Sequence, residues 1–276
     1  MPATRYAVFG DPVDHSLSPR IHSLFAEQTG EALEYTRQQV RAEDFDSAVR
    51  AFFAGGGGGL NITSPHKEHA AALADSGSHA VSLAGAANTL YLQDEKICAE
   101  NTDGAGLVSD LLLNLGWQLE AQRILLLGAG GAVRGVLEPL LACKPAQIVL
   151  ANRTAEKAQQ LVDAFSPGAE LHQVSIEALP LHEAGGGYDL VINGSSAGLS
   201  GSVPAIDATA VDGARCYDMV YGSGAAPFLQ WAGKAGARSV ADGLGMLVEQ
   251  AAAAFYIWRK IHPDAGAVIE QLRNEL

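Results

Sequence analysis

A lysine placed at the start of a predicted helix is the residue of this sequence best suited to proton transfer. The segment Leu60-Asn-Ile-Thr-Ser-Pro-His-Lys67 is typical of a strand that ends at Thr63. Ser64 is then predicted to cap the next helix, with Pro65 at its first position and Lys67 in its first turn. An ammonium group held there can bind a substrate hydroxyl and exchange a proton with it. A solvated surface lysine is the alternative that this segment alone leaves open.

Asp103 is the predicted partner of this lysine. It stands in Asn101-Thr-Asp-Gly104, at the start of an amphipathic helix predicted over 103–115. A carboxylate beside Lys67 would stabilise the ammonium charge and take part in the proton transfer. The two residues are distant in the sequence, so their proximity is a hypothesis about the fold.

A glycine cluster follows a continuous apolar strand in the second half of the chain. The predicted strand Arg123–Leu127 runs directly into Gly128-Ala-Gly-Gly-Ala-Val-Arg134, and a helix to about residue 141 follows. Glycines at this place let the backbone approach a pyrophosphate, while the helix N-terminus offers free N–H groups. Val133 stands where the dinucleotide-binding pattern has its third small residue. The position between strand and helix still predicts a dinucleotide-binding loop, made of Gly128, Ala129, Gly130, Gly131 and Ala132.

The end of the next predicted strand indicates which dinucleotide would bind. In NAD enzymes this strand usually ends in a carboxylate that binds the ribose 2′-hydroxyl. Here it runs into Asn152, Arg153 and Thr154, with Lys157 further on. A guanidinium at this position can form paired hydrogen bonds with a 2′-phosphate, and Lys157 would add positive charge. The sequence therefore favours NADP over NAD, the alternative being that Arg153 only caps a surface turn.

Two other segments contain glycine and small residues. Val191-Ile-Asn-Gly-Ser-Ser-Ala-Gly198 is predicted to be a strand followed by small polar residues, which would let the nicotinamide half of a cofactor lie close. The five glycines of 55–59 have no lysine, serine or threonine at the spacing of a phosphate-binding loop, so they predict a permissive turn.

Composition limits the class of protein. The chain has 276 residues, 48% of them hydrophobic, which is enough for two modest domains. Its net charge of −13 disfavours nucleic acid and anionic membranes as partners. No segment reaches the roughly 20 apolar residues of a membrane span, and the N-terminus lacks a signal-peptide pattern, so we expect a cytoplasmic protein. Three scattered cysteines and eight histidines without a ligand motif predict neither a disulfide framework nor a metal site.

Strands and helices alternate along both halves of the chain, which predicts an α/β protein with mostly parallel sheets. We expect a substrate-binding and catalytic domain over 1–102, completed by C-terminal helices in 242–276. A doubly wound, Rossmann-type domain is expected over 103–241, with a cleft between the two. The first domain has predicted strands at 6–9, 35–40 and 60–63, a hairpin of 89–92 with 96–99, and helices after Pro19 and at 45–54. The second has strands at 123–127, 147–150 and 189–192, and helices at 245–261 and 265–276 close the chain. The apolar stripe of 246–258 is expected to be helix core, with Gln250 facing the cleft.

Nine segments, in the same order along essentially the whole chain, resemble the shikimate dehydrogenase family. They are Val8-Phe-Gly-Asp-Pro12, His15-Ser-Leu-Ser-Pro19, Asn61-Ile-Thr-Ser-Pro-His-Lys67, Ala84-Gly-Ala-Ala-Asn-Thr89, Asn101-Thr-Asp-Gly104, Gly128-Ala-Gly-Gly-Ala132, Asn152-Arg-Thr154, Tyr217-Asp-Met-Val-Tyr221, and Asp242-Gly-Leu-Gly-Met246 with Gln250. The resemblance implies NADP-dependent interconversion of 3-dehydroshikimate and shikimate, in aromatic amino acid biosynthesis, by a monomer or homodimer.

The resemblance also implies roles for individual residues. Lys67 and Asp103 match the catalytic pair of the family, and Ser16 and Ser18 match the serines that hold the substrate carboxylate. Other substrate contacts are implied for Asn61, Thr63, Asn88, Tyr221 and Gln250. Cofactor contacts are implied for Gly128 to Ala132, Asn152, Arg153, Thr154, Lys157, Met219 and Gly243.

Four residues around the catalytic lysine depart from the usual family pattern: Ser64, His66, His79 and Glu100. They leave the implied contact residues intact but could change efficiency or substrate preference. Two alternatives therefore stay open beside shikimate dehydrogenase. One is a relative with weak or shifted activity, towards quinate, another polyol acid or NAD; the other is a non-catalytic protein that binds these ligands.

Overall fold

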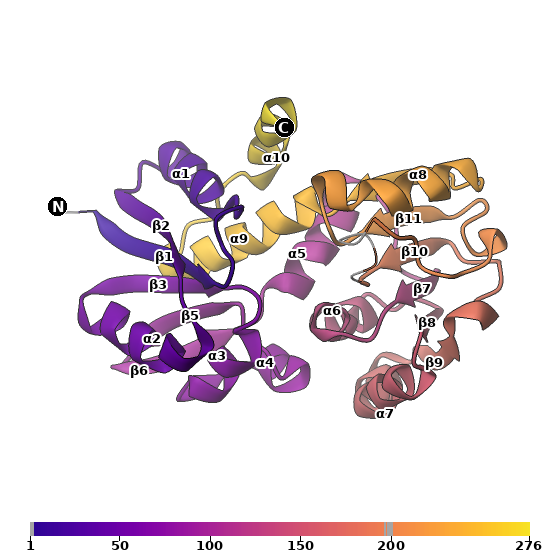
Figure 1. Cartoon of the computed structure of the whole chain (residues 1–276), viewed down its shortest axis with the longest axis horizontal. Helices are drawn as coiled ribbons and strands as arrows, with labels where there is room; N and C mark the ends of the chain where they lie inside the picture. Colours follow the sequence, from indigo (N-terminus) through magenta and orange to yellow (C-terminus); the bar gives the residue numbers. More distant parts are fainter. Residues whose placement is uncertain (1–2, 196, 198–200) are drawn as a thin grey trace. The chain divides into compact units, whose positions relative to one another are not determined.

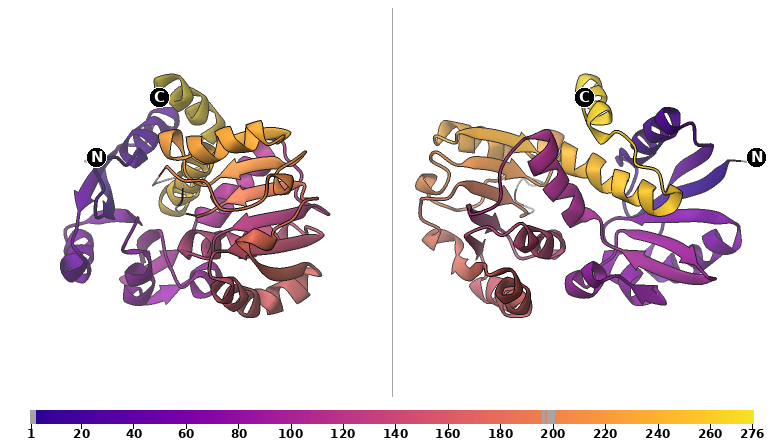
Figure 2. Two further views of the ribbon diagram at one scale, coloured as in Figure 1. Left: turned by 45° about the vertical axis from the view of Figure 1, so that its right-hand side comes forward. Right: turned by 180° about the vertical axis from the view of Figure 1, so that it is seen from behind.

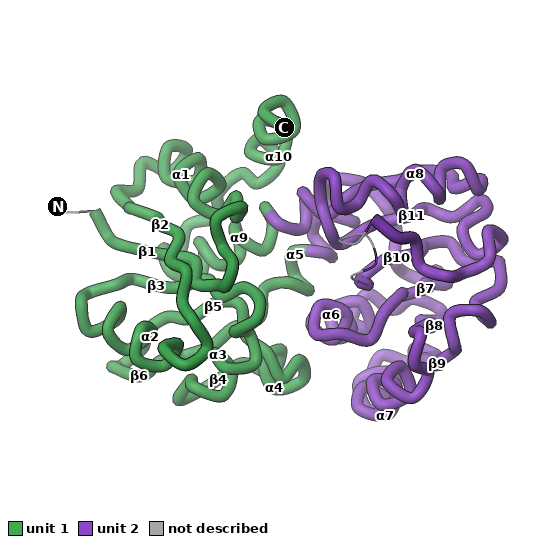
Figure 3. Tube along the Cα trace, in the orientation of Figure 1, with its two compact units in different colours: residues 1–106, 248–276 green, residues 107–247 purple. Residues whose placement is uncertain are grey.

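The chain folds into two compact units, seen here in a computed structural model that describes residues 3–195, 197 and 201–276. Unit 1 comprises residues 1–106 and 248–276, and unit 2 comprises residues 107–247 (Figure 3). Asp103 therefore belongs to unit 1, and the chain passes between the units within two helices. Among the described residues, no helix has both the length and the apolar character to cross a bilayer.

Unit 1 is built on a mixed sheet of six strands, in the order β2-β1-β3-β5-β6-β4 (Figure 1). The β1–β2 and β1–β3 pairs are parallel, whereas β5 pairs with both β3 and β6 in antiparallel fashion. The strands that the sequence predicts are confirmed, with ends that differ by a few residues. The strands are β1 (Thr4–Gly10), β2 (Leu33–Gln39), β3 (Gly57–Ile62), β4 (Ser76–Gly77), β5 (Thr89–Gln93) and β6 (Lys96–Glu100).

Helices cover both faces of this sheet because the strands carry apolar side chains on both sides. Tyr6 and Val8 of β1 face α1 and α9, while Ala7 and Phe9 face α2 and α3 (Figures 1 and 2). This alternation follows from the two-residue period of a strand. The helices of unit 1 are α1 (Ser18–Thr29), α2 (Phe45–Ala54), α3 (Lys67–Leu73), α4 (His79–Ala84), α5 (Asp103–Ser109), α9 (Leu244–Arg259) and α10 (Ala265–Glu275), of which α5 and α9 continue into or from unit 2.

Aromatic rings fill the layer between α1, α9 and the sheet. The ring of His22 is fully buried and stacks on Tyr35 at 4.3 Å between ring centroids. Phe255 and Trp258 of α9 pack against the same histidine, which confirms that the apolar stripe of this helix is core. Burial lowers the pKa of His22 to about 3, so its ring is neutral at physiological pH.

The five glycines of 55–59 end α2 and begin β3, as the turn prediction expects. Gly56 has a φ of 82°, a conformation that favours glycine. Gly57, Gly58 and Gly59 lie in β3, where a β-carbon would collide with the rings of Phe52, Tyr6 and Trp258 respectively. These glycines therefore let aromatic side chains pack directly on the strand backbone.

Unit 2 has a fully parallel six-stranded sheet in the order β12-β11-β10-β7-β8-β9. This is the strand order of a dinucleotide-binding domain, and the direction of winding reverses between β7 and β10. The α/β class and the doubly wound second sheet are thus confirmed. The strands are β7 (Arg123–Leu127), β8 (Gln147–Asn152), β9 (Ser175–Pro180), β10 (Leu190–Asn193), β11 (Arg215–Asp218) and β12 (Ser239–Asp242).

Helices pack on both faces of this second sheet. Phe228 and Ala232 of α8 (Ala226–Lys234) pack on the face formed by Leu125, Leu127 and Val191. The helices α6 (Gly131–Ala142) and α7 (Ala155–His172) lie on the opposite face (Figures 1 and 2). The free thiols of Cys98 and Cys216 are buried, one in each unit.

Two details of the predicted helices are wrong. Ser64 does not cap the helix that carries the lysine, and Pro65 is not its first residue, because α3 begins at Lys67 with His66 at the N-cap position. The carbonyl of Ser64 instead accepts a hydrogen bond from the backbone of Asp11. The predicted helix over 103–115 is α-helical only to Ser109 and continues as a π-helix over Asp110–Asn114.

Candidate active site

The predicted catalytic pair of unit 1 is in direct contact. Nζ of Lys67 lies 2.5 Å from Oδ2 of Asp103, and the hydrogen bond between them is also an ion pair. The lysine side chain is 33% exposed and the aspartate side chain 12% exposed. One end of the pair thus opens to solvent while the carboxylate is fixed inside the unit. The hypothesis that these residues meet in space is confirmed.

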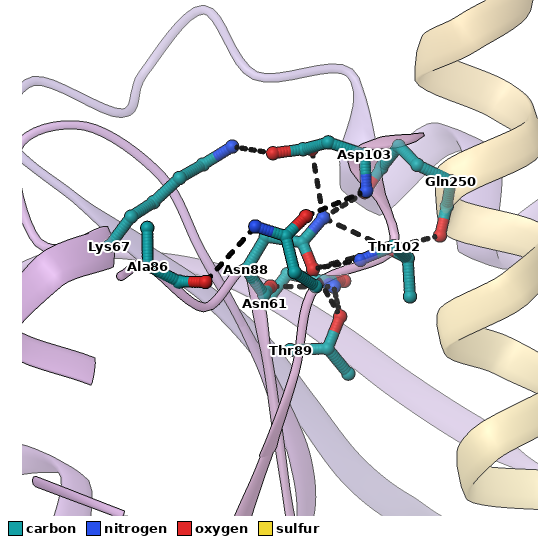
Figure 4. Close-up of polar contacts among 9 residues, drawn as sticks. Asn61, Lys67, Ala86, Asn88, Thr89, Thr102, Asp103 and Gln250 are labelled. Atoms are coloured by element: carbon teal, nitrogen blue, oxygen red, sulfur yellow. Dashed lines mark hydrogen bonds and ion pairs between the residues drawn. The ribbon is translucent and has the colours of Figure 1, made fainter. Parts of the chain in front are cut away.

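Asn88 is the centre of the polar network behind this pair (Figure 4). Its Nδ2 lies 2.9 Å from Oδ1 of Asp103, 2.9 Å from Oγ1 of Thr102 and 3.2 Å from Oε1 of Gln250. Its Oδ1 accepts a hydrogen bond from the backbone N–H of Thr102. A single buried amide therefore holds both the carboxylate of Asp103 and the glutamine of α9. Thr102 carries much of this network, although the sequence analysis assigned it no role.

Asn61 and Thr63 stand at the end of the central strand β3, beside this network. Nδ2 of Asn61 donates to the backbone carbonyl of Asn88, and Oδ1 of Asn61 accepts from the hydroxyl of Tyr35 at 2.7 Å. The backbone N–H of Thr63 donates to Phe9 of β1. The structure thus brings Asn61, Asn88, Asp103 and Gln250 into one connected set, with Lys67 at its edge (Figure 4).

The two serines predicted to hold a carboxylate lie between β1 and α1. The Ser16 and Ser18 hydroxyls are 3.1 Å apart, and the backbone N–H of Ser18 donates to Oγ of Ser16. Ser18 is buried as the first residue of α1. Two hydroxyls and a helix N-terminus at one place form a set of donors that suits an anionic oxygen.

Glu100, one of the four departures from the family pattern, supports the turn that carries the aspartate. Its Oε1 accepts hydrogen bonds from the Ser78 hydroxyl and from the backbone N–H of Asn101 at 3.0 Å. Oδ1 of Asn101 in turn accepts from the backbone N–H of Asp103. Glu100 therefore connects α4 to the start of α5.

Replacing Glu100 by alanine is expected to lower the free energy of unfolding by about 1–3 kcal/mol, because two donors lose a charged acceptor. Glu100→Gln keeps an oxygen at the same place and should lose clearly less. Urea denaturation of the two variants and the wild type measures the difference. Equal losses in both variants would contradict the role of this acceptor.

The other departures lie in different surroundings. His66 is 1% exposed and points into the unit although it adjoins Lys67 in the sequence. Its Nε2 is 2.6 Å from the carbonyl of Val40, and the ring stacks on Phe45. Ser64 and His79 are exposed, His79 as the first residue of α4.

Unit 2 contains a cavity of about 760 Å³ at the point where the winding of its sheet reverses. It is lined by the whole predicted glycine loop, Gly128 to Ala132, by Gly194 and Ser195 after β10, and by Asn152 and Arg153 at the end of β8. A β-carbon placed on Gly130 or Gly131 would meet no described atom within 4 Å, so the loop leaves open space above its backbone. These features fit a dinucleotide whose pyrophosphate lies on the N-terminus of α6.

Val133 replaces the expected third small residue without blocking the loop. It is fully buried, and its Cγ2 would lie only 2.6 Å from a β-carbon on Gly194. Gly194 therefore provides the space that a smaller residue at 133 would otherwise provide. Gly128 has a φ of 109° and lies against the backbone of Gly194 and Ser195. Of the predicted nicotinamide-side segment 191–198, Ser196 and Gly198 lie outside the described residues.

Arg153, the residue predicted to bind the 2′-phosphate of the cofactor, lies on the wall of this cavity. Arg153 lines it, and none of its described lining residues carries a carboxylate. Nδ2 of Asn152 donates to the backbone carbonyl of Thr154, the N-cap residue of α7. Thr154 and Lys157 are exposed but are not part of the cavity wall. Leu181 and His182, which the sequence analysis did not single out, line the cavity as well.

The remaining predicted residues of unit 2 follow β11 and β12. A β-carbon on Gly243 would lie 2.3 Å from the carbonyl oxygen of Met219, so these two backbones are in close contact. Tyr221 is half-buried, and desolvation raises the pKa of its hydroxyl. Next to Met219, the buried Asp218 accepts hydrogen bonds from Nδ2 of Asn193 and from the backbone N–H of Val220.

Burial raises the pKa of Asp218 from 3.8 to about 6, against the lowering effect of its hydrogen bonds with Val220 and Asn193. Between these two pH values the native state binds more protons than the unfolded state, so the free energy of unfolding falls as the pH rises towards 6 and then levels off. Asp218→Asn removes this contribution. Denaturation of both proteins from pH 4.5 to 7.5 should show the wild type losing stability relative to the variant up to about pH 6. Parallel curves would contradict the raised pKa.

Family models match three stretches of the chain. The shikimate dehydrogenase substrate binding domain matches residues 8–90, shikimate / quinate 5-dehydrogenase matches residues 111–199, and the shikimate 5'-dehydrogenase C-terminal domain matches residues 243–273. Together they include Lys67 and the glycine loop, whereas Asp103 and Tyr221 lie between the matched stretches.

Relatives named shikimate dehydrogenase (NADP(+)) extend this likeness over nearly the full chain. The protein of Marinobacter nauticus is 53% identical over 98% of both chains, and that of Alkalilimnicola ehrlichii is 51% identical over 98% of this chain and 99% of the relative. Among solved structures, an Ael1 enzyme from Pseudomonas putida has 45% identity and a TM-score of 0.91, with 98% of both chains covered. Shikimate 5-dehydrogenase from Thermus thermophilus, in complex with NADP(H) and shikimate, has 29% identity and a TM-score of 0.85, with 99% of this chain and 100% of that chain covered. On this evidence the chain belongs to the shikimate dehydrogenase family.

Proposed function

We propose that this protein catalyses the reversible, NADP-dependent interconversion of 3-dehydroshikimate and shikimate, in the cytoplasm. The observation that carries the proposal is the ion pair of Lys67 with Asp103, 2.5 Å apart, because a hydroxyl that is oxidised must give up a proton to a nearby group. The reaction places the protein in the biosynthesis of aromatic amino acids.

The substrate is proposed to bind in unit 1 through donors and acceptors of fixed geometry. Ser16 and Ser18 would take the carboxylate, since their hydroxyls stand together at the start of α1. Asn61, Thr63, Asn88 and Gln250 would bind the ring hydroxyls, with Tyr221 of unit 2 as a further contact. Asn61, Asn88 and Gln250 are already held by one another or by neighbours, so their placement costs little entropy when substrate binds.

NADP is proposed to bind in the cavity of unit 2. The loop Gly128 to Ala132 would hold the pyrophosphate, and Asn152, Arg153, Thr154 and Lys157 the adenosine phosphate. Met219 and Gly243 would lie on the nicotinamide side. When bound, the nicotinamide supplies the chemistry of hydride acceptance and donation.

The protein's own task is to manage one proton and to hold the substrate still. In the direction of oxidation, the neutral amine of Lys67 accepts a hydrogen bond from the substrate hydroxyl. The amine then takes up the proton that the hydroxyl releases. The carboxylate of Asp103 stabilises the resulting ammonium group, and Oδ1 of Asp103 stays bound to Asn88 so that the carboxylate does not rotate. In the direction of reduction, the same ammonium group returns the proton to the forming alkoxide.

The proposal is tested by the absorbance of the reduced nicotinamide, with shikimate and quinate each offered with NADP+ and NAD+. We expect rapid turnover with shikimate and NADP+ and much slower turnover in the other three combinations. Binding of NADP in calorimetry without turnover of either acid would contradict the proposal and favour a ligand-binding relative. If quinate is turned over faster than shikimate, quinate is the substrate.

A further inference from the structure

One face of the edge strand β2 holds the loop that carries Ser16. Side chains alternate along a strand, so Arg37 and Gln39 point to the same side of β2. Nε of Arg37 donates to the backbone carbonyl of Ser16 at 2.8 Å, and Nε2 of Gln39 donates to Oδ1 of Asp11 at 2.6 Å. The loop between β1 and α1 is therefore attached to β2 at two points, of which only Arg37 brings a positive charge.

This attachment fixes the backbone of Ser16 on both sides. Its N–H donates to the carbonyl of Val13 at 3.0 Å, while its carbonyl accepts from Arg37. The Ser16 hydroxyl is then directed to Ser18, 3.1 Å away. Arg37 thus contacts the backbone of Ser16, one member of the serine pair, through one nitrogen of its guanidinium group.

The rest of that guanidinium group has no acidic partner within the described part of the chain. Arg20 and Arg259 form ion pairs with Glu275 and Glu31, whereas none of the ion pairs of the described residues includes Arg37. An arginine has five N–H donors in a planar fork that matches a carboxylate, and the bond to Ser16 uses one of them. Arg37 is exposed, so the donors that the bond to Ser16 leaves unused are accessible to an anionic ligand.

We propose that Arg37 is a substrate-recognition residue, which holds the Ser16 loop in place and supplies the positive charge for the carboxylate of the substrate. The inference rests on the proposed function, in which Ser16 and Ser18 receive that carboxylate. Hydroxyl groups donate hydrogen bonds to both an anion and a neutral ester, and favour the anion only through the greater strength of charge-assisted bonds. A guanidinium group distinguishes them, because its attraction depends on the charge of the ligand.

The test compares shikimate with its methyl ester, which keeps the ring and the hydroxyls but lacks the negative charge. For Arg37→Gln and Arg37→Ala we expect kcat/KM for shikimate to fall about 10-fold, mainly through KM, as for loss of a charge-assisted hydrogen bond. The value for the ester should change less than about 2-fold, so the preference for the acid should fall by about 5-fold or more. Arg37→Lys should retain part of it. The preference of the wild type should also weaken as ionic strength rises.

Gln39→Ala is the matched control, because it detaches the same loop from the same strand face without removing a charge. This variant should leave the ratio of kcat/KM for the acid to kcat/KM for the ester unchanged, even if both values fall. Equal losses for acid and ester in Arg37→Gln would overturn the inference and leave Arg37 as a support of the loop alone, and so would an unchanged preference for the acid. A wild type that does not turn over shikimate at all would instead overturn the proposed function.

Discussion

Replacing Lys67 by alanine is expected to lower kcat by about 10²–10⁴-fold, the usual range for the loss of a general acid–base group. The reason is that Lys67 is in short contact with Asp103 and is the one lysine among the labelled residues of this network. No other amine there can take the proton. Steady-state rates in both directions measure the effect. Calorimetry should show NADP binding unchanged, because the residues that line the cofactor cavity all belong to unit 2.

A suitable control is Lys96→Ala, which removes an exposed ammonium group from β6 in the same unit. It should retain wild-type rates, so that a loss seen only at residue 67 cannot be a general effect of charge. Full activity of the Lys67 variant would show that another group transfers the proton. Loss of folding would appear as a lower melting temperature and would require Lys67→Gln in its place.

The second large effect is expected at Arg153. Its replacement by alanine should lower kcat/KM for NADP+ by about 10–100-fold, which corresponds to about 1.5–3 kcal/mol for hydrogen bonds to a charged group. The value for NAD+ should change little, because NAD lacks the 2′-phosphate. The ratio of the two cofactors, measured with saturating shikimate, is therefore the decisive quantity.

Lys157→Ala provides the comparison for this prediction. Lys157 lies in the first turn of α7 and is not among the residues that line the cavity, so its charge should act more weakly on the phosphate. We expect a reduction of kcat/KM for NADP+ of a few-fold at most. A proportional loss for NADP+ and NAD+ in the Arg153 variant would mean that this residue contacts the adenine rather than the phosphate.

The sequence predicts unit 2 well because its signals are local. The strand Arg123–Leu127 has the predicted bounds, and the glycines after it lie on the cavity wall as expected. A strand, a glycine loop and a helix follow one another within about 20 residues, so hydrophobic pattern and turn chemistry together determine the geometry. The local sequence does not predict how the loop accommodates Val133. The space for its side chain comes from Gly194, which follows β10 and is distant in the sequence.

The surroundings of Lys67 could be predicted less completely because distant contacts decide them. Ser64 and Pro65 have the composition of a helix start, yet Asp11 takes the carbonyl of Ser64, and the helix begins three residues after Ser64. The burial of His66 also depends on a distant contact, because its ring lies against the carbonyl of Val40, directly after β2. Arg37 has no motif around it either, and its relation to Ser16 exists only through the parallel pairing of β1 with β2.

Because unit 1 is divided into residues 1–106 and 248–276, it cannot fold completely until the end of its synthesis on the ribosome. Unit 2 is continuous, so all of its residues are synthesised before Gln250 and Trp258. Until then unit 1 lacks the helix whose tryptophan donates to Leu90 and whose Arg259 pairs with Glu31. The usual order, in which the N-terminal domain matures first, is therefore expected to be inverted. Until α9 is made, only α1 covers that face of the nascent sheet, and the part that Phe255 and Trp258 cover later stays exposed.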